Sequence, residues 1–130
     1  MKTSPLGNTV SAILLTVIIG LGLLTAPPLM AADEANLVGT YKCEGSSGGG
    51  NTYKGTVEIT RKGDTYHLKW SLSANEHYTG IGILQGDVLA VSYYGTMKGV
   101  VAYKVDDDKL TGKWTTVDGN GSVNAEVLTR

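Results

Sequence analysis

The residues able to carry out chemistry are few and scattered. His67 and His77 are ten residues apart and fall on the polar side of neighbouring strand-like segments. They could at most form a loose surface metal pair, and ordinary exposed histidines are the alternative. The aspartates at 106–108 lack the alternating ligands and the distal glutamate of a calcium loop, so we expect a charged turn there. The sequence therefore predicts neither a metal site nor a cofactor.

Acidic and nucleophilic side chains do not form a recognisable catalytic set either. Glu58 and Glu126, together with Glu44, are the acids inside strand-like segments, and nothing in the sequence pairs two of them as acid and base. Cys43 is the only cysteine, which rules out an intramolecular disulfide. It is either buried on the tyrosine-bearing face of the first strand or available for an intermolecular bridge. We expect no enzymatic activity.

Aromatic side chains are the remaining candidates for a site. The chain has seven tyrosines, two tryptophans and no phenylalanine, so every aromatic ring carries a hydrogen-bonding group. Six of the tyrosines and both tryptophans can be placed on one face of short alternating strands. The candidates for a ligand pocket are Tyr41, Tyr66, Trp70, Tyr93, Tyr103 and Trp114. These rings either line a cavity for a small ligand or simply fill the core.

The elements that must position these rings are strands. From Leu37 onward apolar and polar residues alternate in short segments, and glycine, aspartate and asparagine separate them. In 66–73, for example, Tyr, Leu, Trp and Leu alternate with His, Lys, Ser and Ser. A Gly-Asp turn recurs at 63–64 and 86–87, and the repeating unit is one β-hairpin. The glycine-rich stretch 45–51 is expected to be a loop, either a gate or a plain connector.

These segments predict an all-β domain. Three hairpins, with 37–44 before them and 121–129 after them, give eight antiparallel strands in an up-and-down meander. Such a meander can close into a small barrel of the lipocalin or avidin type, which also removes the exposed sheet edges. Glycines within the strands suit the sharp bending of a narrow barrel. An open twisted sheet or a sandwich is the alternative.

A second apolar surface is expected on the outside of three consecutive strands between Thr79 and Lys104. If the tyrosine face is inside, the partner-surface candidates face outward; they are Ile81, Ile83, Val88 and Val100, with Ala90 and Ala102 between them. An exposed apolar patch of this kind is typical of a surface for a partner or for self-association. A bulge near Gly80 and Gly82 would instead swap the two faces.

The first 32 residues are predicted to be a signal peptide. Lys2 is their only charged residue, and an apolar run from Ala12 to Leu24 follows it. Residues 33–36 are a short linker and 37–130 a single domain. Removal of the signal leaves 10 of the 11 basic residues and all 12 acidic ones, a balance that fits neither a nucleic-acid-binding nor a membrane-binding surface. We expect an exported protein of the periplasm or extracellular space, without stable membrane insertion.

The hairpin pattern resembles a family of small exported bacterial β-proteins, commonly labelled fibronectin-binding protein or uncharacterised. The segments that carry the resemblance are Tyr53–Ile59, Gly63–Trp70, Tyr78–Ile83, Gly86–Tyr93 and Leu110–Thr115. A looser likeness to lipocalin and avidin barrels lies in Gly39-Thr40-Tyr41. The first resemblance implies an extracellular protein partner, such as a matrix protein, and the second implies the barrel fold.

Three functions are compatible with the sequence. The first is a non-enzymatic binding module that engages a protein partner, or a second copy as a homodimer, through the outer apolar patch. The second is a barrel that binds a small apolar or aromatic ligand among its inward rings. The third is an inhibitor of a secreted enzyme that inserts a hairpin loop, such as 75–77 or 118–120.

Overall fold

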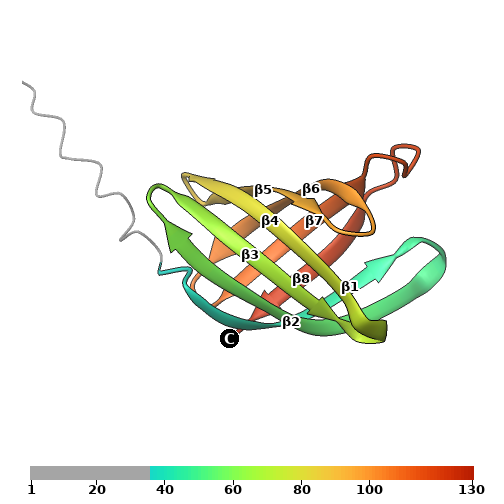
Figure 1. Ribbon diagram of the computed structural model, residues 1–130, viewed down its shortest axis with the longest axis horizontal. Helices are drawn as coiled ribbons and strands as arrows, with labels where there is room; N and C mark the ends of the chain where they lie inside the picture. The colour runs from blue at the N-terminus through green and yellow to red at the C-terminus, as the bar shows by residue number, and fades with distance from the viewer. Residues whose placement is uncertain (1–35) are drawn as a thin grey trace, which may run out of the picture.

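The protein is an eight-stranded antiparallel barrel, seen here in a computed structural model that describes residues 36–130 (Figure 1). Each strand pairs with its neighbours in sequence, and β1 pairs with β8 to close the barrel. The strands are β1 Gly39–Ser47, β2 Asn51–Lys62, β3 Thr65–Leu72, β4 Glu76–Gln85, β5 Val88–Tyr94, β6 Lys98–Asp106, β7 Lys109–Thr116 and β8 Asn124–Thr129. Two single-turn 3₁₀ helices, η1 Gly48–Gly50 and η2 Ser73–Asn75, complete the elements.

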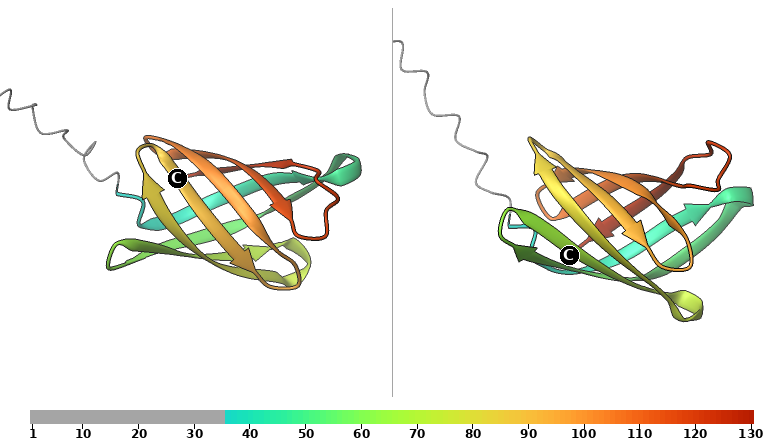
Figure 2. Two further views of the ribbon diagram at one scale, coloured as in Figure 1. Left: turned by 90° about the horizontal axis from the view of Figure 1, so that it is seen from above. Right: turned by 45° about the horizontal axis from the view of Figure 1, so that its top comes forward.

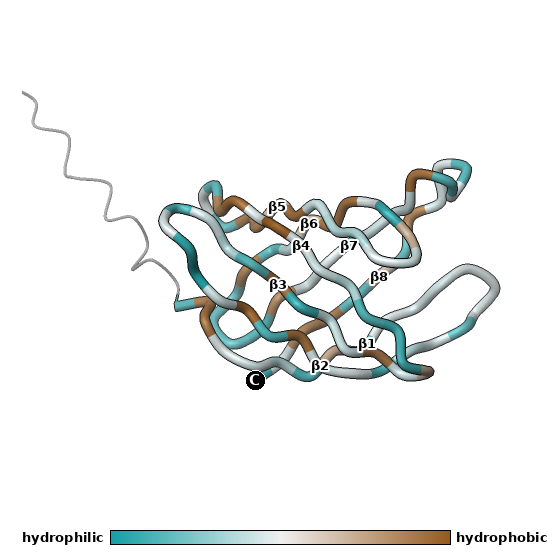
Figure 3. Tube along the Cα trace, viewed as in Figure 1, coloured by the Kyte–Doolittle hydropathy of each residue, from teal (hydrophilic) through white to brown (hydrophobic). Residues whose placement is uncertain are grey.

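The core is the interior of the barrel. Apolar residues at every second position of each strand point inward, because successive side chains of a strand alternate between its two faces. The same alternation of hydrophobic and hydrophilic residues is visible along β3 (Figure 3). Six of the seven tyrosines face the interior, and the seventh, Tyr94, is exposed. Cys43 is buried as well.

The meander gives the barrel two different ends (Figure 2). Tight two-residue turns join β2 to β3 and β4 to β5, where Gly63 and Gly86 have φ angles of 58° and 61°. That left-handed backbone costs glycine little, which explains the repeated Gly-Asp turns. The β6–β7 turn and both ends of the described chain lie at this same end. The opposite end carries η1, η2 and the links 95–97 and 117–123.

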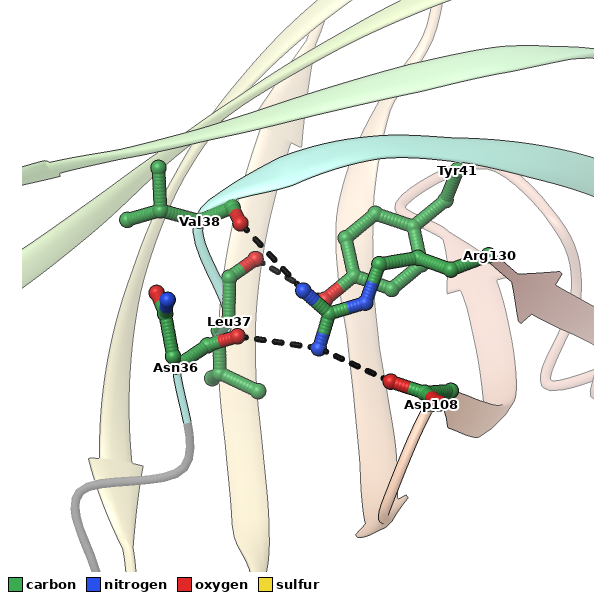
Figure 4. Close-up of polar contacts among 6 residues, drawn as sticks. All are labelled: Asn36, Leu37, Val38, Tyr41, Asp108 and Arg130. Atoms are coloured by element: carbon green, nitrogen blue, oxygen red, sulfur yellow. Dashed lines mark hydrogen bonds and ion pairs between the residues drawn. The ribbon is translucent and has the colours of Figure 1, made fainter.

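An arginine closes the end that holds the tight turns (Figure 4). The Arg130 guanidinium lies 5.1 Å from the ring centroid of Tyr41, and its Nη2 donates to the Asn36 carbonyl oxygen at 3.0 Å. The same nitrogen is 3.3 Å from a carboxylate oxygen of Asp108. Below it, the Tyr41 hydroxyl donates to the Leu37 carbonyl oxygen at 2.9 Å. These contacts tie the two ends of the described chain together across the base of the barrel.

The predicted barrel and meander are confirmed, and the open sheet and the sandwich are excluded by the closing β1–β8 pair. The expected loop at 45–51 is wrong, since β1 and β2 continue through it and only the glycines 48–50 form the turn. No bulge interrupts β4 at Gly80 or Gly82, so its two faces keep their register. The predicted signal peptide, 1–32, lies outside the described residues. Residues 36–130 include no helix of the length and hydrophobicity that a membrane crossing requires.

Candidate functional site

A cavity of about 270 Å³ lies at the end of the barrel that carries η1 and η2. Its walls are aromatic: Tyr53, Trp70, Tyr78, Tyr93 and Trp114. Smaller and more flexible residues complete the lining: Ser47, Leu72, Ser73, Ala74, Met97 and Val101. Two carboxylates also line it, Glu76 and Glu126. With Arg130 and Tyr41 closing the other end, this cavity can be entered from one side.

Glu126, on β8, is the buried polar centre of the site. Its side chain is only 5% exposed, in a barrel interior that is otherwise apolar or aromatic. Its Oε1 accepts hydrogen bonds from Trp70 Nε1 at 3.0 Å and from the Tyr103 hydroxyl, and its Oε2 accepts one from the Tyr53 hydroxyl at 2.7 Å. These three hydrogen bonds to its two oxygens offset the cost of removing the carboxylate from water.

Glycines create the room in which these donors reach Glu126. In the strand register Glu126 has Gly45 of β1 on one side and Gly112 of β7 on the other. Tyr53 pairs with Gly45, and Tyr103 pairs with Gly112. A Cβ atom on Gly45 would lie 2.1 Å from the Tyr53 ring, and one on Gly112 would lie 2.6 Å from the Tyr103 ring. Each tyrosine therefore folds over a glycine to donate to the same carboxylate.

The other rings of the wall hold one another in place. Tyr93 packs edge-on against Tyr78, with ring centroids 5.8 Å apart, and lies 6.2 Å from Trp70. The Tyr93 hydroxyl donates to the Thr115 carbonyl oxygen at 2.9 Å, and the Tyr78 and Thr96 hydroxyl oxygens are 2.9 Å apart. Both tyrosines are thus held in place by their neighbours, and both line the cavity.

Trp114 carries a hydrogen-bond donor that the protein leaves unused. Its ring packs edge-on against Tyr53, with centroids 6.2 Å apart, and it lines the cavity. The Nε1–H is buried, and within residues 36–130 it has no hydrogen-bond partner. Burial raises the pKa of Tyr53 and the Trp114 side chain lowers it, which places the Trp114 N–H near the Tyr53 hydroxyl, although their geometry falls short of a hydrogen bond.

Burial keeps the acidic hydroxyl and thiol groups of the site protonated. Desolvation by burial, followed by the nearby Glu126 carboxylate, raises the pKa of Tyr53 and of Tyr103 well above the usual tyrosine value. Burial raises the pKa of Tyr93 to about 12, with smaller effects from Tyr78 and Glu126. Burial and the Glu126 carboxylate also raise the pKa of the Cys43 thiol. These groups are hydrogen-bond donors at neutral pH, and Cys43 is no nucleophile.

Three of the six predicted pocket residues line the cavity, and the other three do not. Trp70, Tyr93 and Trp114 line the cavity. Tyr103 is fully buried behind it, where it donates to Glu126. Tyr41 and Tyr66 do not belong to the cavity lining: Tyr41 packs under Arg130 at the closed end, and Tyr66 packs under Arg61.

Sequence reasoning passed over Tyr53, Tyr78 and, above all, Glu126. Glu126 precedes Leu128 by two residues on the same strand, and side chains two apart on a strand share a face. Since an apolar Leu128 faces the core, the same alternation places the carboxylate inside the barrel. That signal was present in the sequence, and it pointed to the central polar group of the site.

The four partner-surface candidates lie outside the barrel, away from this site. Ile81, Ile83, Val88 and Val100 are between 38% and 57% exposed. Ile83 pairs with Ala90 and Ala90 with Ala102, while Ser92 lies between Ile81 and Val100, so these residues form a largely apolar strip over β4, β5 and β6. In residues 36–130 no three His, Cys, Asp or Glu side chains are grouped so that they could hold a metal ion.

Comparisons with known proteins show the fold. No protein-family model and no curated protein matches the sequence. Among solved structures, the redesigned β-barrel b11L5F_LGL is similar with a TM-score of 0.63 and 23% identity, over 72% of this chain and 90% of that one. The redesigned barrel mFAP1, bound to DFHBI, has a TM-score of 0.58 and 23% identity, over 72% and 94%. A fluorescence-activating β-barrel designed de novo has a TM-score of 0.55 and 19% identity, over 75% and 97%.

Proposed function

We propose that the barrel binds one small, largely apolar ligand through its open end and does so without catalysis. The observation that carries this proposal is the cavity itself, which has five aromatic rings around a buried carboxylate that accepts three hydrogen bonds. Apolar walls with a few fixed polar groups are typical of small-molecule sites. The protonated tyrosines and the inert Cys43 supply no nucleophile, which favours binding over reaction.

The size of the cavity limits the ligand. Sites for small molecules usually measure about 300–1,000 Å³, and this one, at about 270 Å³, is just below that range. A single ring with a short substituent fits such a volume, whereas a long alkyl chain would have to project from the mouth. The similar barrel mFAP1 is bound to DFHBI, which supports the idea that this fold can hold a compact ligand.

Binding can be measured directly because Trp70 and Trp114 both line the cavity. We expect their emission to change when the purified protein is titrated with 2-phenylethanol or with toluene, and its melting temperature to rise. Leu72→Trp, which places a larger side chain in the lining, should weaken binding about tenfold or more. The matched outward substitution Val100→Thr should not change it. If neither probe shifts emission or melting, the barrel is not a ligand carrier.

The outer apolar strip supports a second candidate function, the engagement of a protein partner or of a second copy. Its four large apolar side chains are exposed next to one another. Isolated exposed apolar residues are common on protein surfaces, whereas a contiguous patch is typical of an interaction surface. Replacement of both Ile81 and Val100 by lysine should abolish association while the far-ultraviolet circular dichroism spectrum is retained. An unchanged sedimentation profile and unchanged partner binding would remove this candidate.

Export and matrix-protein binding stay predictions of the sequence. The apolar run from Ala12 to Leu24 supports export to the periplasm or extracellular space. The resemblance to proteins labelled fibronectin-binding supports a matrix partner, and inhibition of a secreted enzyme through 75–77 or 118–120 is the third alternative.

A further inference from the structure

The charges around the cavity indicate which class of ligand it accepts. Two carboxylates line it, Glu126 inside and Glu76 beside η2, and among the lining residues of the described chain there is no lysine, arginine or histidine. A carboxylate or phosphate ligand would bring a third negative charge with no cation to meet it. Glu126 is buried, so water would screen the repulsion between it and a second negative charge only weakly, whereas Glu76 is exposed and contributes less.

The aromatic walls also favour a cationic ligand over an anionic one. The faces of tyrosine and tryptophan rings carry the negative part of the ring quadrupole, so they attract a cation positioned over them. Five such rings surround the cavity, and the packing described above fixes the orientation of Tyr78 and Tyr93. The Tyr53 hydroxyl donates to Glu126 and the Tyr93 hydroxyl donates to the Thr115 carbonyl oxygen, so neither ring adds a charge of its own to the wall.

Glu126 is held in place before any ligand binds. Trp70, Tyr53 and Tyr103 come from three different strands and fix both of its oxygens. The Cys43 thiol also interacts with this carboxylate, so a cation in the cavity would meet Glu126 through its charge and not through an unused acceptor position. An indole N–H and two tyrosine hydroxyls are neutral groups, so these hydrogen bonds bring no positive charge to the carboxylate.

We propose that the ligand is a small organic ammonium ion, whose charge meets Glu126 and the ring faces and whose apolar part packs against the rings. This inference rests on the proposed ligand-binding function and adds the charge of the ligand to it. An ammonium group would supply the positive charge that the three neutral donors do not bring, without any rearrangement of those donors.

Three probes of nearly equal size and different charge test the proposal. They are 2-phenylethylamine, which is cationic at pH 7, 2-phenylethanol, which is neutral, and 3-phenylpropionate, which is anionic. We expect the amine to bind the purified protein about tenfold or more tightly than the alcohol and the carboxylate to bind least. Isothermal titration calorimetry gives the three dissociation constants directly.

The variant Glu126→Gln tests whether Glu126 causes the preference for the amine over the alcohol, and Glu58→Gln is its control. Glu126→Gln keeps the size of the side chain and removes its charge, so the ratio of amine to alcohol affinity should fall towards one. Glu58 lies on β2 and is exposed on the outer face, so Glu58→Gln should leave the ratio as it is. If Glu126→Gln does not fold, the comparison of the three probes on the unaltered protein still decides.

Each outcome has a distinct meaning. Equal binding of amine and alcohol, or tighter binding of the carboxylate, would overturn the ammonium proposal while the ligand-binding function stands. A preference that survives Glu126→Gln would overturn the role of Glu126. Absence of binding by all three probes and by toluene would overturn the proposed function itself.

Discussion

The hydrogen bond from Tyr103 to Glu126 offers the sharpest test of the site, because Tyr103→Phe removes one hydroxyl and nothing else. The Tyr103 ring is fully buried against Gly112, and phenylalanine keeps that ring and its packing. No cavity opens beyond the volume of the lost oxygen. Any change in the free energy of unfolding therefore reports on the hydrogen bond between the Tyr103 hydroxyl and the Glu126 carboxylate.

The expected loss follows from the charge of the acceptor. A hydrogen bond between neutral groups contributes about 0.5–1.5 kcal/mol, whereas one to a charged group contributes about 1.5–3 kcal/mol. Water cannot replace the hydroxyl easily, because Tyr103 has no exposed surface. We expect Tyr103→Phe to lower the free energy of unfolding by about 2 kcal/mol, which for a domain of this size lowers the melting temperature by about 8–16 °C.

Two further tyrosine variants make the measurement specific. Tyr53→Phe removes a second donor to Glu126, but Tyr53 is only partly buried and lines the cavity, so water can take its place. Its cost should be about 1 kcal/mol. Tyr66→Phe, under Arg61 and outside the cavity lining, is the control for loss of a tyrosine hydroxyl. Its ring still faces the guanidinium after the change.

Urea unfolding followed by tryptophan fluorescence provides the free energies, provided that the m value is the same for all variants. The order of loss should be Tyr103→Phe, then Tyr53→Phe, then Tyr66→Phe. A loss for Tyr103→Phe of less than about 0.5 kcal/mol, or one equal to that of Tyr66→Phe, would refute the reasoning. It would mean that Glu126 does not depend on the Tyr103 hydroxyl as the geometry indicates.

Three other changes test the supports of the site. Gly112→Ala places a Cβ atom 2.6 Å from the rigid Tyr103 ring and should cost about 2–3 kcal/mol in urea unfolding; Gly48→Ala, with no atom within 4 Å of its Cβ, is the neutral control. Arg130→Ala removes the contacts to Tyr41, Asn36 and Asp108 and should lower stability by about 1–2 kcal/mol, measured by thermal unfolding. Burial raises the pKa of Tyr93 from 10.0 to about 12, so Tyr93 loses its hydroxyl proton at lower pH in the unfolded chain than in the folded one. The contribution of the protonated side chain to the free energy of unfolding is therefore complete below pH 10 and should be lost as the pH rises towards 12. Circular dichroism and the 295 nm absorbance of tyrosinate should then change together; free titration of Tyr93 near pH 10 in a folded barrel would contradict the burial argument.

The fold could be predicted because its determinants are local. Alternation assigns each side chain to a face, and the Gly-Asp turns join strands at a fixed spacing, so the eight strands and their order follow from the sequence. The stretch 45–51 was misassigned because glycine and serine are typical of loops. Its strand structure comes from pairing across the hairpin, where Ser46 faces Thr52 and Gly45 faces Tyr53. Such pairing is a tertiary effect that composition does not report.

The candidate site could be predicted only in part. The alternation of a strand shows which side chains face the barrel interior, but not how far along the barrel axis each of them lies. Trp70, Tyr93 and Tyr41 all point inward, yet the stagger of the strands places the first two at the cavity and the third under Arg130. Which end of the barrel closes depends on that stagger and on the position of Arg130. Neither can be read from the alternation of a single strand.

The paired residues Tyr53, Gly45, Glu126, Gly112 and Tyr103 are an argument for the proposed binding function, because stability alone does not require them. Moving a carboxylate out of water costs several kcal/mol, and well-packed apolar side chains often replace a buried charged group without loss of stability. A barrel interior shaped by stability alone would fill the positions of Gly45, Glu126 and Gly112 with branched apolar residues, as at Val57, Leu68 and Leu89. Here two glycines instead clear the space beside one carboxylate, and three donors from three strands orient it next to a cavity. This arrangement fixes a carboxylate at one point of an aromatic cavity, as the proposed binding of a small organic cation would require.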